Sequence, residues 1–296
     1  MKLVRFGPPR QERPGIWLAH GAPDGAPGIL DIRAMAFDLE DFDSRFFEHG
    51  GLLRLNGLLQ EPARIVRPAA GLRIGPPLHP GKILCLGKNY AEHAAELGGG
   101  VPQTPVVFSK ALSSLQGPFD PITLPAQSNV VDGEAELAVV IGRRAHRVTE
   151  AEALSFVAGY TVLNDVTDRE AQRAGGQWFY GKSMDGFCPL GPWLVTADEV
   201  PDPHALRVFS RLNGETLQED TTGSMVFRIP RLLAYLTAGI TLEPGDLIAT
   251  GTPAGIGSAR KPPRALREGD HLETGVDGLG TQSAQVTREP GARSLP

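Results

Sequence analysis

The stretch Val130–Gly142, "VVDGEAELAVVIG", decides the fold, because it puts two carboxylates at the start of a run that is otherwise typical of a buried strand. Side chains on a strand alternate between its faces, so Glu134 and Glu136 project from one face, about 6 to 7 Å apart along the chain. In residues 137–141 apolar side chains fall on both faces. We therefore expect a strand that is covered on both sides and carries a like-charge pair at its entrance.

A cation would allow the two carboxylates to lie together. Neighbouring carboxylates raise each other's pKa unless a positive charge lies between them, and oxygen ligands favour a hard ion such as Mg²⁺. Asp165 ends the apolar strand in "GYTVLNDVTDREAQ" and is a third candidate ligand, because strand ends often form sites. The alternatives are a solvated strand end for the Glu134–Glu136 pair and a turn or helix N-cap for Asp165. Either pattern alone favours these alternatives.

The segment "GKNYAEHAAELGGG" contains a candidate general base. His93 and Glu96 are three residues apart, so on a helical turn they share a face and can form a hydrogen bond. A carboxylate beside an imidazole raises its basicity and fixes its tautomer, as activation of water requires. The three glycines at residues 98–100 suggest the hinge of a lid. The alternative is a surface helix with an incidental ion pair.

Two further segments contribute candidate substrate contacts. Lys182, in "FYGKSMDGFCPLGPW", is positioned to act as an electrostatic clamp, with a solvated lysine as the alternative. The segment "TGTPAGIG", residues 250–257, lacks the Lys-Ser/Thr of a P-loop, which argues against nucleotide binding there. Its glycines would instead let the backbone and Thr252 approach a small ligand. The sequence has no G-x-S-x-G elbow of a serine hydrolase.

Composition narrows the function classes. The 296 residues are 41% hydrophobic and 21% charged, as in an ordinary globular protein. A net charge of -5 and the lack of basic, aromatic-interleaved runs argue against nucleic-acid binding. Cys85 and Cys188 lack CxxC spacing and are expected to be core thiols in a reducing compartment. No membrane segment or signal peptide is recognised, so we expect a cytoplasmic protein.

Thirty-six glycines and 26 prolines, spread along the chain as turn residues, predict a mainly β (α+β) fold. Residues 1–75 are expected to form a small N-terminal module with a helix over residues 37–47, followed by a Pro-rich surface connector to about residue 80. A catalytic domain is expected over residues 81–287, and a flexible tail over residues 288–296.

The expected catalytic domain contains mostly strands. A capping box predicts a helix over residues 149–156, another helix is expected over 227–237, and "NGE" at residues 213–215 indicates a hairpin. Strands are expected over residues 82–87, 136–142, 157–166, 192–200, 206–214, 246–253 and 271–280.

Several segments, in order from about Gly81 to Val286, resemble the fumarylacetoacetate hydrolase family. They are "KILCLGKNYAEHAAE", "PVVFSKALSSLQGP", "EAELAVVIG", "GYTVLNDVTDRE", "QWFYGKSMDGFCPLGPWLVTADE", "LEPGDLIATGTPAGIG" and "VDGLGT". The resemblance implies a mixed β-sandwich roll around a divalent metal, Mg²⁺ with Mn²⁺ or Ca²⁺ as alternatives, in a homodimer. It implies metal ligation by Glu134, Glu136 and Asp165, a His93–Glu96 dyad on a mobile lid, and Lys182 and Thr252 beside the substrate.

The resemblance also implies an activity. "NDVTDREAQ", "KPPRAL" and the eighty-residue leader resemble bacterial hydrolases of 2,4-dioxo-3-deoxy sugar acids. Gly133, where many members of the family carry an aromatic residue, and "KSMDGF", in place of the commoner "KSFDTF", are expected to reshape the pocket and leave the substrate open. The expected reaction is metal-dependent hydrolysis of a carbon–carbon bond in a 2,4-dioxo acid, an acylpyruvate or such a sugar acid, to pyruvate and a carboxylic acid. His93 activates the water, and the metal with Lys182 stabilises the departing enolate.

Four alternatives stay open. Decarboxylation of a 2-oxo diacid such as oxaloacetate and isomerisation of a related dienoate, such as a homoprotocatechuate-pathway intermediate, would pass through a similar enolate. A ureidoglycolate lyase-like reaction is a third, and a non-catalytic metal-binding protein of the same fold is a fourth. For each of the enzymatic alternatives the expected binding partner is a small-molecule substrate, a 2-oxo or ureido acid. No nucleic-acid or membrane partner is expected.

Overall fold

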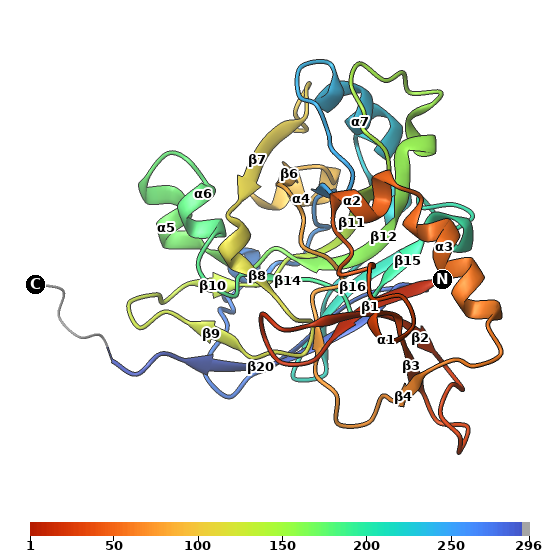
Figure 1. Cartoon of the computed structure of the whole chain (residues 1–296). Coiled ribbons are helices and arrows are strands. Elements are labelled where there is room, and N and C mark those ends of the chain that lie inside the picture. The colour runs from red at the N-terminus through yellow and green to blue at the C-terminus, as the bar shows by residue number, and fades with distance from the viewer. Residues whose placement is uncertain (292–296) are drawn as a thin grey trace, which may run out of the picture.

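The computed structural model of the chain describes residues 1–291, which contain one large mixed sheet (Figure 1). The sheet joins the N-terminal strands, red in Figure 1, to the strands of the body through the pairing of β1 with β15. Its order is β4 (Val66–Pro68), β3 (Gly28–Asp31), β2 (Arg13–Leu18), β1 (Lys2–Phe6), β15 (Leu194–Thr196), β12 (Val157–Asn164), β11 (Ala135–Ile141), β18 (Leu247–Ala249), β6 (Ile83–Gly87) and β7 (Val106–Lys110), with β5 (Ile74–Gly75) beside β1.

The strand β11 lies between β12 and β18 and is buried along its whole length. Leu137, Val139 and Ile141 belong to one apolar cluster, whereas Ala138 and Val140 belong to another on the opposite face. This arrangement confirms the prediction that the strand after the two glutamates is covered on both sides.

A second sheet packs against this central region. It has five strands in the described residues, and its strands β16 and β19 contact β11. Its order is β17 (Glu215–Thr221), β16 (Arg207–Leu212), β19 (His271–Val276), β20 (Gly280–Arg288) and β9 (Ile122–Leu124). Two short pairs complete the strands, β10 (Val131–Asp132) with β13 (Thr167–Asp168), and β8 (Leu115–Gln116) with β14 (Cys188–Pro189). The predicted mainly β fold is confirmed.

The helices are short and are interspersed among the strands along the sequence. They are α1 (Ile32–Met35), α2 (Ser44–Glu48), α3 (Gly51–Gln60), α4 (Ala91–Glu96), α5 (Arg169–Ala174), α6 (Phe179–Lys182) and α7 (Ile229–Thr237), with 3-10 turns at Leu112–Ser114, Ala153–Phe156, Ala197–Glu199, Thr222–Ser224 and Gly257–Ala259. Within residues 1–291 none of them combines the length and the apolar character that crossing a membrane needs. The predicted helix over residues 227–237 is confirmed by α7.

Two helix predictions are wrong. Residues 37–43 form a turn, irregular chain and a bend, and α2 begins only at Ser44, because the carboxylate of Asp43 accepts a hydrogen bond from Phe46 N at 2.9 Å and caps the helix there. Residues 149–152 form a turn in which Thr149 N donates to Glu152 Oε1 at 3.0 Å. Only a 3-10 turn follows, because strand β12 already starts at Val157.

Three smaller expectations can be compared with the structure. The "NGE" hairpin is confirmed, since Asn213 and Gly214 have φ of 54° and 85° and join β16 to β17. The surface connector is wrong at residues 74–78, which are buried and include β5. The tail is wrong at its start, because Arg288 ends β20 and Glu289 N donates to Leu124 O at 3.0 Å. Residues 292–296 lie outside the described part of the chain.

The N-terminal residues share their core with the body. Leu3 and Leu30 are fully buried in the same apolar cluster as Ala138 and Leu247. The boundary between an N-terminal module and a catalytic domain near residues 75–81 therefore stays a proposal drawn from the sequence.

Candidate active site

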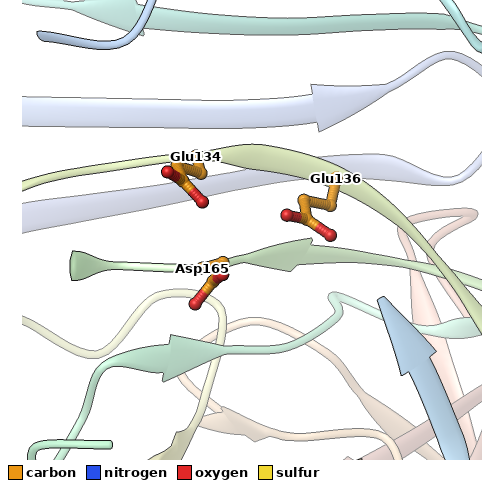
Figure 2. Close-up of side chains that lie close together, drawn as sticks. All are labelled: Glu134, Glu136 and Asp165. Atoms are coloured by element: carbon orange, nitrogen blue, oxygen red, sulfur yellow. The ribbon is translucent and has the colours of Figure 1, made fainter. Parts of the chain in front are cut away.

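Three carboxylates meet where β11 begins and β12 ends. The register of the two strands pairs Ala135 with Asn164, so Glu134 stands opposite Asp165, whose backbone N donates to Glu134 O at 2.9 Å. One carboxylate oxygen from each of Glu134, Glu136 and Asp165 lies within 4.8 Å of the others, and Figure 2 shows the three groups gathered between the strands. All three side chains are buried.

Two buried lysines contact these carboxylates. Lys182, at the end of α6, places Nζ 2.6 Å from Glu134 Oε2 and 2.6 Å from Asp165 Oδ2. Lys110, at the end of β7, places Nζ 2.7 Å from Asp165 Oδ1 and also donates to the backbone oxygen of Lys182. Burial acts to lower the pKa of Lys182, but Asp165 and Glu134 outweigh it and raise that pKa.

Glu134 is further held by an arginine that the sequence analysis did not single out. Arg169, the first residue of α5, donates to Glu134 Oε1 at 2.5 Å and to Asp132 Oδ1 at 2.7 Å. Burial opposes ionisation of Glu134, but the charges of Lys182 and Arg169 outweigh it and lower its pKa. The two ion pairs thus favour the charged form of Glu134.

Glu136 differs from its neighbours in having no basic side chain within ion-pair distance in the described residues. Its Oε2 accepts a hydrogen bond from Gly251 N at 2.8 Å. Burial, followed by the charges of Asp165 and Glu134, raises its pKa well above the usual range. A divalent cation beside the three carboxylates would remove that penalty, and the all-oxygen donor set suits a hard ion. The residues present therefore fit such a metal.

His93 and Glu96 form the expected pair on α4. His93 Nδ1 lies 2.6 Å from Glu96 Oε1, which leaves Nε2 to exchange a proton with water. Glu96 Oε2 accepts a hydrogen bond from Gly255 N at 2.9 Å. Gly255 has a φ of 104°, and a Cβ there would lie 2.1 Å from Leu217 O. Glycine is thus required where the 250–257 loop fixes the carboxylate that orients the histidine.

A pocket of about 310 Å³ connects these groups. Five of the seven predicted site residues line it, namely His93, Glu134, Glu136, Lys182 and Thr252, while Asp165 and Glu96 are not part of the lining. The wall also includes the apolar or aromatic side chains of Leu86, Leu97, Phe108 and Trp178 and the polar side chains of Lys88, Arg169, Gln172, Arg173 and Ser258.

The hydroxyl of Thr252 forms hydrogen bonds within the pocket wall. It donates to Ala135 O at 2.9 Å and accepts from Gln218 Nε2 at 2.7 Å. These bonds fix the loop against the start of β11. Thr252 therefore lies at the pocket as expected, with its hydroxyl already engaged.

The predicted effect of Gly133 on the pocket is wrong. Gly133 does not line the pocket, and a Cβ there would lie 2.9 Å from Leu272 Cδ2 and 3.0 Å from Asn164 Oδ1. The same Asn164 oxygen accepts a hydrogen bond from Glu134 N at 3.0 Å. The missing side chain therefore makes room for an asparagine that positions Glu134. Met184, in "KSMDGF", also lies outside the lining.

Comparisons with known proteins identify the family of the chain. Residues 82–287 match the family described as "Fumarylacetoacetate (FAA) hydrolase C-terminal". A Burkholderia cenocepacia protein that carries the name "Putative hydrolase" is 46% identical over 291 residues, which cover 97% of this chain and 99% of that protein.

Two crystal structures that this chain resembles differ in their named reactions. Maleylpyruvate hydrolase from Sphingobium sp. SYK-6, in complex with manganese(II) and pyruvate, is 30% identical with a TM-score of 0.79 and covers 98% of this chain and 100% of its own. The 5-carboxymethyl-2-hydroxymuconate delta-isomerase from Mycobacterium smegmatis is 34% identical with a TM-score of 0.76, at the same coverage of both chains.

Proposed function

Because the chain belongs to the fumarylacetoacetate hydrolase family, we propose that it is a metal-dependent hydrolase of 2,4-dioxo acids. It would cleave the C3–C4 bond of an acylpyruvate or a 2,4-diketo-3-deoxy sugar acid and release pyruvate and a carboxylic acid. The observation that carries the proposal is that the His93–Glu96 pair and the three carboxylates serve one pocket. Glu134, Glu136 and Asp165 would hold Mg²⁺, with Mn²⁺ or Ca²⁺ as alternatives.

The chemistry divides between the ion and the protein's own residues. A bound divalent cation would supply Lewis-acid polarisation of the substrate's carboxylate and 2-oxo group. Lys182 adds a fixed positive charge at the pocket wall, where negative charge develops on the pyruvate half. Arg169 and Lys110 hold the carboxylates in place through their hydrogen bonds.

The proposed bond changes conserve atoms and charge. His93 Nε2 takes a proton from a water molecule, whose oxygen bonds to C4 of the substrate. The C3–C4 bond then breaks, its electron pair stays with the pyruvate half as an enolate, and a proton returns to C3. Glu96 keeps Nδ1 protonated, so that Nε2 can accept the proton from water and then return it to C3.

A second candidate reaction is isomerisation of a dienoate or decarboxylation of a 2-oxo diacid. The similarity to the Mycobacterium smegmatis isomerase favours it. A base that accepts a proton from water can equally accept one from carbon, so the His93–Glu96 pair serves either reaction. The hydrolase is preferred because the Burkholderia cenocepacia relative, 46% identical over nearly the whole chain, carries the name "Putative hydrolase".

Product analysis separates these reactions. Purified protein with Mg²⁺ is incubated with acylpyruvates, 2,4-dioxo-3-deoxy sugar acids, a dienoate diacid and oxaloacetate, while pyruvate, the second acid and carbon dioxide are measured separately. Equimolar pyruvate and a second carboxylic acid are expected. Carbon dioxide without a second acid would contradict the hydrolase and support the decarboxylase.

The metal ligands are tested in the same assay. E134A and D165A are expected to lower metal-dependent turnover by at least about 100-fold, because each removes a charged oxygen ligand. Both should also lose Mn²⁺ binding in calorimetry. E268A, at an exposed glutamate outside the pocket, is the matched control. Turnover by E134A and D165A at the control's rate would refute the assignment.

The homodimer that the family resemblance implies and the cytoplasmic location expected from the sequence are further proposals. Light scattering measures the first, and cell fractionation measures the second. A monomer at assay concentrations would contradict the dimer without affecting the proposed reaction.

A further inference from the structure

Lys88 is a pocket residue whose backbone conformation disfavours a side chain. It lies between β6 and α4, and its φ is 55°, in the left-handed region. Residues with a Cβ are crowded there, and glycine or asparagine takes the position more readily. Strain of this kind persists only where the surroundings fix the backbone, and it concentrates at functional sites.

Asn89 fixes the backbone at this point. Its Nδ2 donates to Thr250 O at 2.7 Å and to Phe227 O at 3.1 Å, while its Oδ1 accepts from Phe227 N at 2.8 Å. The side chain of Asn89 thus joins three separate segments of the chain. The conformation of Lys88 is determined by this junction, and its side chain lines the pocket.

The ammonium of Lys88 lies near Gly99, one of the three glycines that follow α4. A Cβ on Gly99 would lie 3.2 Å from Lys88 Nζ, so a glycine at that position leaves the ammonium its space. Lys182 and Arg169, in the same pocket, are already paired with carboxylates. Within residues 1–291, the side chain of Lys88 has no hydrogen-bonding partner and no carboxylate within ion-pair distance. Its charge is therefore available to a ligand.

The remaining pocket wall offers few neutral polar groups to a polyhydroxylated ligand, chiefly Ser258 Oγ and Gln172 Nε2. Thr252 has its hydroxyl engaged on both sides, and Gln172 Oε1 already accepts from Arg169. Phe108 and Trp178 pack edge to face with ring centroids 5.3 Å apart. What this wall does offer is apolar surface and uncommitted positive charge, from Lys88 and from the exposed Arg173.

We propose that Lys88 binds a second anionic group of the substrate, a carboxylate at the end remote from the 2-oxo acid. This inference rests on the proposed function and narrows it, because it selects 2,4-dioxo diacids over neutral acylpyruvates and sugar acids. The charge of Lys88 is separate from the charges that hold the three carboxylates. The charge of Lys88 therefore determines which substrates are preferred and leaves the proposed metal site unchanged.

The test compares two substrates of equal length. 2,4-Dioxoheptanedioate ends in a carboxylate and 2,4-dioxoheptanoate in a methyl group, while the bond to be cleaved is the same. The ratio of their kcat/KM values is expected to fall about tenfold or more in K88M, because a charge-assisted hydrogen bond to the distal carboxylate is lost. K88G should show the same fall with an undiminished Tm, because glycine adopts a φ of 55° without strain.

A matched control is available in the chain. Arg147 also has a φ of 55° but is exposed and does not line the pocket, so R147M should keep the wild-type ratio. A ratio in K88M within twofold of the wild type overturns the role of Lys88. So does an equal fall in R147M.

Binding measurements separate this inference from the proposed reaction. 2-Oxoheptanedioate and 2-oxoheptanoate lack the 4-oxo group and cannot be hydrolysed, so calorimetry reports their affinities without turnover. Wild-type protein should bind the diacid more tightly, and K88M should remove the difference. If wild-type protein hydrolyses neither dioxo acid yet shows this Lys88-dependent preference, the hydrolase fails and the subsite stands. Equal affinities of wild-type protein for both ligands overturn the subsite.

Discussion

The imidazole of His93 depends on two hydrogen bonds in series that begin at the backbone of Gly255. Gly255 N donates to one oxygen of Glu96, and the other oxygen contacts His93 Nδ1. A carboxylate can accept at both positions, whereas an amide cannot. The choice of glutamate over glutamine therefore sets the tautomer of the histidine.

A change of one side-chain group, from the carboxylate of Glu96 to an amide, is therefore expected to have a large effect. In E96Q the amide oxygen stays with Gly255 N, and the amide NH₂ faces His93 Nδ1. The neutral imidazole must then carry its proton on Nε2, where it cannot accept one from water. We expect kcat to fall about 10²- to 10⁴-fold in E96Q, nearly as far as in H93A.

The control for this prediction is E92Q, which alters an exposed glutamate of the same helix. E92Q should keep the wild-type kcat, and E96Q should keep wild-type Mn²⁺ affinity in calorimetry. A kcat for E96Q within twofold of the wild type would mean that the pair is only structural.

At the residue level the sequence is informative where chemistry is local. The alternation of a strand places Glu134 and Glu136 on one face, and helical spacing pairs His93 with Glu96. Lys110 shows the limit, because it meets Asp165 only through contacts between segments 55 residues apart. A lysine at a strand end is ordinarily solvated, and nothing nearby in the sequence indicates otherwise.

Among the elements, β17 contributes a side chain that connects the strand of the glutamates to the 250–257 loop. Gln218 Oε1 accepts from Ala135 N and from Ser210 Oγ, both at 3.0 Å. Its Nε2 donates to Thr252 Oγ1 at 2.7 Å and to Pro253 O at 2.8 Å. The oxygen of the buried amide thus accepts two hydrogen bonds and its nitrogen donates two.

Removing this amide should destabilise the protein strongly. In Q218A several buried polar groups lose a partner, and each unsatisfied group costs about 1–3 kcal/mol. We expect the free energy of unfolding to fall by about 3–5 kcal/mol, measured by chemical denaturation. Q60A, at an exposed glutamine that ends α3, should change it by less than about 0.5 kcal/mol. A loss in Q218A no larger than in Q60A would show that water replaces the amide.

Prediction of whole elements succeeds where the pattern is strong. The strands β11, β12 and β16 and the helix α7 follow from apolar runs and clear ends. The helix α3 is not foreseen, because Gly51 and Gly57 lower its intrinsic helix propensity. Leu55, which is fully buried in the same apolar cluster as Phe46, stabilises it through tertiary packing that no local pattern reveals.

At the scale of the whole molecule, the N-terminal strands and the body behave as one packed unit. β1 pairs with β15, joining Leu3 to Leu194, and both residues are fully buried in one apolar cluster. The Trp17 and Trp193 rings lie 5.3 Å apart across the same junction. Stability is therefore shared across the proposed boundary at residues 75–81.

Sharing of the core predicts a single cooperative unfolding transition and an unstable fragment. Deletion of residues 1–75 removes the strand that covers the edge of β15 and exposes the apolar partners of Leu3 and Leu30. We expect the fragment 76–296 to aggregate. In the full chain carrying W17F, fluorescence of the body's Trp178 and Trp193 and far-UV circular dichroism should give coincident guanidinium transitions. A soluble fragment with metal-dependent turnover would show instead that the N-terminal region folds against a body that is already stable on its own.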